Sequence, residues 1–192
     1  MTRTPTRPAA LRGKIFRGSE QVRRGVLTPT SLRSSAWQRV FPDVYACSSL
    51  PLDHRRRARA AAGLLLPTAT VSGRSAAVLW GVEDLAGPDD DVELTVDPGC
   101  RAGAVRGLRV TRRTLTDDEV TRRSGVRVTT PLRTALDLGR VQPPDEAVVC
   151  LDQFLRSRLV TLGELRAAAA VTTGPGCRGI RLAAGRADGL AH

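Results

Sequence analysis

Apolar residues recur along the chain at two periods, which separate predicted helices from predicted strands. Spacings of three and four residues, typical of one buried helix face, mark the segments 53–66, 72–81, 131–138, 145–158 and 161–170. Alternation of apolar and polar residues, typical of a half-buried strand, marks the segments 92–96, 107–112 and 126–129. The chain is therefore expected to fold as α+β, with a three-stranded or similar sheet segregated from C-terminal helices.

Residues 17–46 are predicted to form a short helix-turn-helix. A first helix opens at Ser19, and Gly25 ends it as a C′ glycine. A second helix begins at Thr28-Pro29, where an N-cap residue is followed by a first-turn proline. The apolar stripe of this second helix contains Leu32, Ala36, Trp37 and Val40.

Pro42-Asp43 interrupts the second predicted helix. The apolar pairs on either side, Val40-Phe41 and Val44-Tyr45, are expected to form a small β-wing of two strands. Polar side chains on this helix are expected to face a DNA groove, because such groups hydrogen-bond phosphates and base edges. They are Thr30, Ser31, Arg33, Ser34, Gln38 and Arg39. The alternative is a small structural helix pair with a solvated polar face.

The predicted helix over residues 53–66 begins with a run of arginines: Arg55, Arg56, Arg57 and Arg59. Side chains at this spacing cannot all face a core, so this end is expected to be solvated or bound to nucleic acid or acidic protein. Together with Arg23 and Arg24 of the first helix, these arginines are the candidate phosphate contacts. The alternative is a solvated helix end that links two domains.

The composition is compatible with one domain or two small ones. The chain has 192 residues, and its hydrophobic content of 41% is sufficient for a core. Its net charge is +11, which favours an acidic polymer as partner. If the protein neutralises about six phosphates, its affinity for the polymer should fall ~10³-fold as the salt concentration rises from about 50 to 200 mM. Double-stranded DNA is therefore the expected partner.

The cysteines are far apart in the sequence and are expected to be reduced thiols: Cys47, Cys100, Cys150 and Cys177. A zinc site needs clustered Cys or His ligands, so no metal site and no cofactor is expected. No apolar run is typical of a signal peptide or approaches the ~20 residues of a membrane span. The protein is therefore expected to be cytoplasmic, with no membrane partner.

An acidic cluster before the first predicted strand is the best candidate for catalysis. Asp89–Asp91 and Glu93 superficially match the carboxylates of a metal-dependent nuclease motif, but that motif also needs a lysine to help activate water. Thr95 occupies the corresponding position, so an Asp-rich turn is the favoured interpretation. His54 is expected to be exposed, and no GxSxG elbow is present. The chain is predicted not to be an enzyme.

Six motifs follow one another along most of residues 16–170: GVLTPTSLRSSAWQRVFPDVYA, RRRARAAAGLLLP, GRSAAVLWG, VELTV, GVRVTTPLRTALDLGR and LVTLGELRAA. Their order resembles the AbiEi-type antitoxins and transcriptional regulators of type IV toxin–antitoxin systems, in the form common in high-GC actinobacteria. The resemblance implies a winged helix-turn-helix joined to an α+β domain, operator binding and autorepression. It also implies a nucleotidyltransferase toxin as a partner.

The chain differs from the family pattern in two ways. Its helix-turn-helix is shorter than the full family form, and it stops at His192, where many actinobacterial relatives continue into a Vsr-like endonuclease domain. It is thus expected to be a stand-alone regulator or a truncated relative of such a protein. A protein-interaction module, whose second domain binds an acidic partner, is the alternative function.

The expected organisation has five parts. They are a disordered arm (1–13), a winged helix-turn-helix (14–52), a linking helix (53–66), an AbiEi-like α+β domain (67–171) and a flexible tail (172–192), in which residues 180–184 could add a helical turn.

Overall fold

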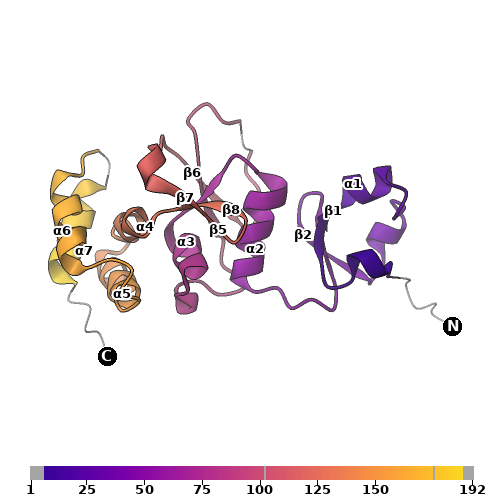
Figure 1. Cartoon of the computed structure of the whole chain (residues 1–192), viewed down its shortest axis with the longest axis horizontal. Helices are drawn as coiled ribbons and strands as arrows, with labels where there is room; N and C mark the ends of the chain where they lie inside the picture. The colour runs from indigo at the N-terminus through magenta and orange to yellow at the C-terminus, as the bar shows by residue number, and fades with distance from the viewer. Residues whose placement is uncertain (1–6, 102, 175, 188–192) are drawn as a thin grey trace.

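A computed structural model describes residues 7–101, 103–174 and 176–187. The described chain is mixed α+β, with two sheets and seven α-helices. Figure 1 shows a small N-terminal unit, a central sheet with helices beside it, and a layer of C-terminal helices at the far end. The α+β prediction is confirmed.

The N-terminal unit is built around a three-stranded antiparallel sheet. Its elements are the 3₁₀ helix η1 (Ala9–Leu11), β1 (Ile15–Arg17), α1 (Gly18–Arg23), the 3₁₀ helix η2 (Ser31–Arg33), β2 (Trp37–Phe41) and β3 (Val44–Cys47). The strand order is β1-β3-β2. The first helix, its end at Gly25 with φ +68°, and the pairing on either side of Pro42-Asp43 are all confirmed.

The second predicted helix is wrong beyond one turn. Only η2 is helical, and Trp37 and Val40 lie in β2. The hydroxyl of Ser34 donates to the carbonyl of Ser31 at 2.7 Å, and such local bonds compete with helix propagation. Trp37 is instead buried edge-on against Phe16, with ring centroids 5.0 Å apart. Tertiary packing therefore overrides the helical spacing.

The described part of the predicted disordered arm is ordered. Leu11 is 5% exposed and belongs to the N-terminal core, with Phe16, Leu27, Ala36, Trp37 and Cys47. Residues 1–6 lie outside the described residues. The short apolar run before Lys14 closes one side of this small core.

The central unit contains a five-stranded sheet instead of three strands. Its elements are α2 (His54–Ala60), the π-helix η3 (Ala61–Leu65), β4 (Thr70–Val71), α3 (Gly73–Trp80), the 3₁₀ helix η4 (Glu83–Leu85), β5 (Val92–Val96), β6 (Leu108–Arg112), the 3₁₀ helix η5 (Asp117–Glu119), β7 (Val120–Arg123) and β8 (Val126–Thr129). The order is β6-β5-β4-β8-β7, with parallel pairs β4–β8 and β5–β6. Strands β4 and β7 were missed because neither has an apolar alternation of its own.

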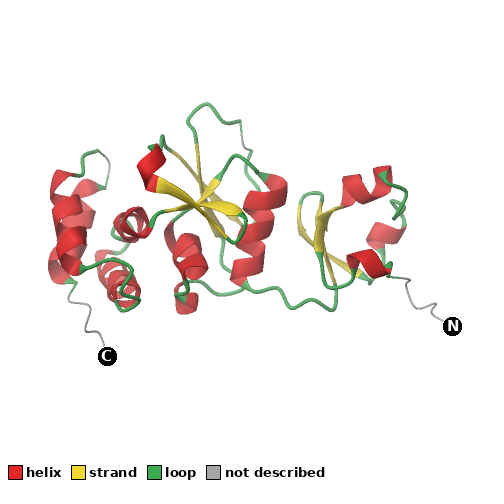
Figure 2. Ribbon diagram, in the orientation of Figure 1, coloured by secondary structure: helices red, strands yellow, loops and turns green. Residues whose placement is uncertain are grey.

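The predicted linking helix is part of the central core. Ala58 and Ala61 are fully buried and pack with Val92 and Leu94 of β5. Figure 2 shows α2 and α3 on either side of the strands. On the other face of β5, Glu93 and Thr95 face the start of α3 and the helix α4 (Pro131–Leu138).

The remaining helices are α5 (Pro144–Leu155), α6 (Leu162–Val171) and α7 (Cys177–Arg186). Capping boxes at Thr116 and Thr161 begin η5 and α6. The predicted flexible tail is wrong over residues 177–186, because α7 packs on α5 and α6. Ile180 is fully buried there against Gly139. Residues 188–192 lie outside the described residues.

Candidate nucleic-acid interface

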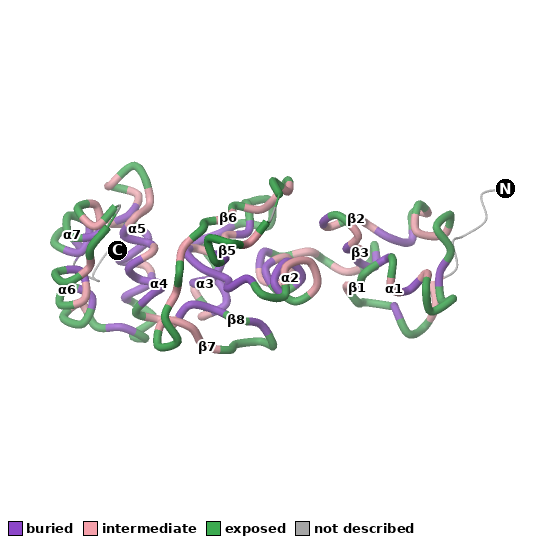
Figure 3. Tube along the Cα trace, turned by 90° about the horizontal axis from the view of Figure 1, so that it is seen from above, coloured by how far each residue is buried: buried purple, intermediate pink, exposed green. Residues whose placement is uncertain are grey.

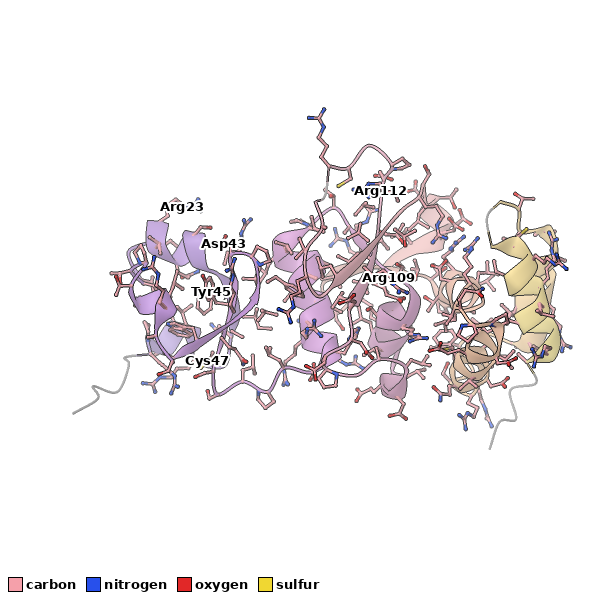
Figure 4. All side chains as sticks on the ribbon, turned by 180° about the vertical axis from the view of Figure 1, so that it is seen from behind. Arg23, Asp43, Tyr45, Cys47, Arg109 and Arg112 are labelled. Carbon is pink, nitrogen blue, oxygen red and sulfur yellow. The ribbon has the colours of Figure 1, made fainter. Side chains whose placement is uncertain are left out.

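The turn between β2 and β3 is fixed to the start of α1. Asp43, with φ +59°, accepts hydrogen bonds from the Ser19 backbone N (2.7 Å) and hydroxyl (2.6 Å). Arg17 Nε donates to the same carboxylate at 3.1 Å. Partial burial raises the pKa of Asp43, but these bonds outweigh it and hold the pKa below its ordinary value. Figure 4 shows Asp43 near the base of α1. A side chain distant in sequence therefore caps α1.

Three of the predicted DNA-contacting arginines are exposed and lie on three elements of the N-terminal unit. They are Arg23 on α1, Arg33 on η2 and Arg39 on β2. Within the described chain none of their guanidinium groups has a hydrogen bond or ion pair, and Thr30 is exposed beside Arg33. Figure 4 shows Arg23 pointing away from the rest of the molecule. These side chains are accessible to an anionic partner.

Three other predicted groove residues are engaged within the fold. The Ser31 hydroxyl donates to Thr28 O at 2.8 Å, and the Ser34 hydroxyl is used in the same turn. Gln38 Nε2 donates to Leu50 O at 3.0 Å and holds β2 against the segment after β3. The structure therefore turns these three side chains toward backbone groups of their own unit.

Arg24 has an acidic partner on its own helix. Its guanidinium lies 3.3 Å from the Glu20 carboxylate, one helical turn away. Exposed pairs of this kind contribute only about 0.3–0.5 kcal/mol. Arg24 is accessible but carries a compensated charge.

The arginines of α2 are used mainly inside the molecule, which differs from the predicted phosphate contacts. Arg55 donates to Val78 O at 2.8 Å and pairs with Glu83 at 3.0 Å. Arg56 pairs with Asp53, the N-cap of α2, at 2.9 Å. These contacts fix the first turn of α2 to α3 and to its own cap.

The other two arginines of α2 connect distant segments. Arg57 donates to the carbonyls of Pro88 and Asp90 and lies over the ring of Phe41. Arg59 Nε donates to Ser124 O at 3.1 Å, in the turn between β7 and β8. The arginine run could not be separated into these roles by its spacing, since each partner comes from another part of the chain.

A basic groove separates the N-terminal and central units. It has a volume of about 500 Å³, and the charged side chains in its lining are Lys14, Arg56 and Arg59. No acidic residue of the described chain lines it. Lys14, which precedes β1 by one residue, was not among the predicted contacts.

His54 is 3% exposed, so the expectation of an exposed histidine is wrong. Glu93 N donates to the Ser75 hydroxyl at 2.8 Å, which leaves that hydroxyl to donate to His54 Nε2 at 2.7 Å. His54 Nδ1 then donates to Gly87 O at 3.0 Å. Burial lowers the pKa of His54 below its ordinary value. The neutral tautomer with its proton on Nδ1 satisfies this chain, and its role is to connect α2, α3 and β5.

A cluster of arginines surrounds one aspartate on α4. Asp137 accepts from Arg133 at 2.8 Å, Arg113 at 2.9 Å and Arg140 at 3.0 Å. Glu119 also binds Arg133 at 2.7 Å. Burial lowers the pKa of Arg140, and the neighbouring Arg133 charge adds to the effect. This network connects the residue after β6 with η5 and α4.

The acidic cluster does not converge on one point. Asp90 Oδ2 accepts from Gly87 N at 2.8 Å and closes the turn before β5, whereas Glu93 accepts from Arg74 N at 2.8 Å. Within the part of the chain that the structure describes, no group of three or more His, Cys, Asp or Glu side chains is placed to hold a metal ion. No helix in that part has the length and apolar character needed to cross a membrane.

No family model and no curated protein matches the chain. Among solved structures, the fold is similar to the crystal structure of RV2827C protein from Mycobacterium tuberculosis, with a TM-score of 0.58 and 14% sequence identity. The match covers 89% of this chain and 72% of that chain. At this identity, the likeness concerns the fold alone.

Proposed function

We propose that the protein is a DNA-binding transcriptional regulator and that its N-terminal unit is a short winged helix-turn-helix. The observation that carries the proposal is the element order of this unit. Two short helical elements, α1 and η2, lie between β1 and the β2–β3 hairpin, and the strand order is β1-β3-β2. A helix, a turn, a second helical element and a hairpin in this order are typical of a winged helix-turn-helix.

The charge distribution of the N-terminal unit supports the proposal. Arg23, Arg33 and Arg39 lie on the first helix, the second helical element and the wing, and each is exposed. Arginine binds phosphate oxygens with two parallel N–H groups. Contacts of this kind position a protein on a duplex.

The shortness of η2 limits the recognition of bases. A recognition helix presents several side chains to the major groove, whereas η2 has three residues and directs the Ser31 hydroxyl to its own turn. We therefore propose binding that depends mainly on phosphate contacts, with a steep dependence on salt.

Gel-shift titration against the DNA upstream of the gene, and against a shuffled duplex of the same composition, tests the proposal. Measurements at about 50 and 200 mM salt should show weaker binding at the higher concentration, and tighter binding to the upstream DNA at both. Equal weak binding to the two duplexes would contradict sequence-specific binding to an operator. Undetectable binding to both at the lower salt would remove DNA binding altogether.

We also propose an antitoxin role of AbiEi type, with autorepression and a nucleotidyltransferase toxin as partner. This part depends on the six sequence motifs described above. Co-expression with the product of an adjacent gene tests it, with retention of that product during purification as the expected result. A reporter under the upstream promoter tests autorepression, and unchanged expression on adding the protein would contradict it.

A protein-interaction module is the second candidate function. The observation that favours it is a set of exposed apolar side chains on the C-terminal helices: Val149 (53% exposed), Val171 (79%) and Leu182 (49%). Native mass spectrometry of the protein with the adjacent gene product would test it. A complex that is lost on Val171→Ser would support this function, and a monomer in the presence of that product would contradict it.

A further inference from the structure

Strands β7 and β8 form a tight hairpin beside α2. Their two-residue turn, Ser124-Gly125, has φ of +52° and +82°, the left-handed geometry of a type I′ turn. In the register of the hairpin, Arg122 lies directly opposite Arg127. Figure 3 shows the hairpin directed toward the N-terminal unit, with its turn ending beside α2.

The Arg122–Arg127 pair is electrostatically unfavourable in the isolated chain. Directly opposite residues of an antiparallel pair have Cβ atoms only about 4.5–5.5 Å apart, and like charges there are destabilising. Both arginines are exposed, and within the described chain neither guanidinium group has a hydrogen bond or an ion pair. An anion bound between the two guanidinium groups would remove this repulsion.

Neighbouring side chains hold the hairpin in place. Arg123 donates to Leu79 O at 2.6 Å and lies 4.6 Å from the centroid of the Trp80 ring. On the other side, Arg59 of α2 donates to Ser124 O. Arg122 and Arg127 are therefore presented on a fixed backbone, which lowers the entropic cost of binding.

The turn of this hairpin borders the basic groove between the two units. Ser124 and Gly125 line that groove together with Lys14, Arg56 and Arg59. Positive charge thus continues from the groove to the hairpin. Arg122 and Arg127 were not among the predicted contacts, because only their strand pairing places them opposite one another.

We propose that the β7–β8 hairpin is a second contact surface for nucleic acid, in which Arg122 and Arg127 bind the sugar–phosphate backbone. This inference rests on the proposed DNA-binding function and extends it from the N-terminal unit to the central unit. A phosphodiester is the partner that fits, because its anionic oxygens recur at short intervals and match the guanidinium fork. The contact adds affinity without reading the base sequence.

The salt dependence of binding tests the proposal. The double variant R122Q/R127Q is titrated with a shuffled duplex over about 50–200 mM salt. Loss of two phosphate contacts lowers the slope of log K against log salt by about 1.8, and weakens binding about 10- to 60-fold near 100 mM salt. The variant R122K/R127K retains both charges, and we expect it to keep the wild-type slope.

A matched control separates this surface from net charge. R158Q/R178Q removes the same charge from exposed positions in the C-terminal helical layer, and we expect no change in the slope. Thermal unfolding gives a readout that does not involve DNA: R122Q/R127Q should be at least as stable as the wild type, because it removes a repulsive pair. A purely structural pair would instead lose stability.

Two results would overturn the inference in different ways. The first is that the wild type binds the duplex but R122Q/R127Q has the same slope, or that the R158Q/R178Q control lowers the slope as much as R122Q/R127Q does. In that case the hairpin is not a contact surface, and the proposed function is unaffected. If the wild type binds no duplex at the lowest salt, the proposed function itself fails.

Discussion

The guanidinium of Arg57 on α2 lies 5.9 Å from the centroid of the Phe41 ring on β2. The same group donates to the carbonyls of Pro88 and Asp90, in the turn before β5. A Cβ atom at Gly107, which has φ +83°, would lie 2.9 Å from the Arg57 Nη2 atom. One side chain of the central unit therefore contacts the N-terminal sheet, the acidic turn and the start of β6.

Replacing Arg57 should loosen the contact between the two units. We expect R57Q to lower the free energy of unfolding by about 1–2 kcal/mol, because charge-assisted hydrogen bonds to two carbonyls are lost. Urea denaturation measures the change. R56Q is the control, since within the described residues the guanidinium of Arg56 bonds to Asp53 and Pro51 of its own segment, and its effect should be below about 0.5 kcal/mol. Equal effects of the two variants would contradict a connecting role for Arg57.

Removing the charge of Asp137 should be strongly destabilising. The Asp137 and Arg133 side chains are each 8% exposed, and two further arginines converge on the same carboxylate. We expect D137N to cost about 3–5 kcal/mol, because it removes the carboxylate that three arginines share and leaves the buried Arg133 paired with Glu119 alone. Denaturant unfolding monitored by circular dichroism measures this loss.

An exposed aspartate provides the comparison for that experiment. Asp145 pairs with Arg186 at 2.7 Å, but the Asp145 side chain is 80% exposed. We expect D145N to cost less than about 1 kcal/mol. A similarly small loss for D137N would show that the arginine cluster tolerates the missing charge.

Asp43 should matter for the stability of the N-terminal unit. D43A removes the cap of α1 and places alanine at φ +59°, so we expect a loss of about 2 kcal/mol from the lost cap and the backbone strain. In D43N the side-chain amide oxygen can still accept the hydrogen bond from Ser19 N, and asparagine tolerates a positive φ. Most of the stability should therefore remain. Thermal unfolding of the two variants checks this order, and equal losses would contradict it.

The buried His54 should make stability depend on pH. Its pKa is lowered by burial from the ordinary value of 6.5, so below pH 6.5 the unfolded chain takes up a proton that the folded chain does not. Stability should therefore be complete above pH 6.5 and fall as the pH decreases toward the folded pKa, by at most about 1.4 kcal/mol per pH unit.

The variant H54Q isolates this effect from other titrating groups. Urea unfolding at pH 7.5, 6.5 and 5.5 is compared between H54Q and the wild type. The difference in stability between the two proteins should shrink as the pH falls, because only the wild type loses the histidine contribution. A difference that does not change with pH would show that His54 is protonated equally in the folded and unfolded states.

The exposed arginines of the N-terminal unit should determine the salt dependence of DNA binding. We expect R33Q/R39Q to lower the slope of log K against log salt by about 1.8, through the loss of two phosphate contacts. R24Q is the control on the same unit, because Arg24 already pairs with Glu20, and its effect on the slope should be smaller. An unchanged slope for R33Q/R39Q would place the DNA contacts elsewhere.

Much of the secondary structure was predictable because its signals are local. The capping boxes at Thr116 and Thr161, and the prolines at the starts of α4 and α5, satisfy backbone groups within one helical turn. The alternation of apolar and polar residues over 92–96 predicted β5 in the same way. Here a few neighbouring residues determine the outcome, so the sequence alone is enough.

The second predicted helix shows where local signals fail. Trp37 and Val40 have the spacing of a helix face, but both lie in β2. From this strand the Trp37 ring packs edge-on against Phe16. Strand β7, with two arginines in four residues, is stabilised by its ladder with β8. Neither outcome depends on neighbours in sequence, because the contacts that decide it come from other elements.

The sequence by itself determined the α+β class, most helix boundaries and a net charge of +11. Tertiary structure alone decided which arginines are accessible. It turned the arginines of α2 toward carbonyls and carboxylates of their own chain, left Arg33 and Arg39 exposed, and placed Arg122 opposite Arg127. The reason is physical: composition counts charges, but only the folded arrangement determines which of them already have a partner.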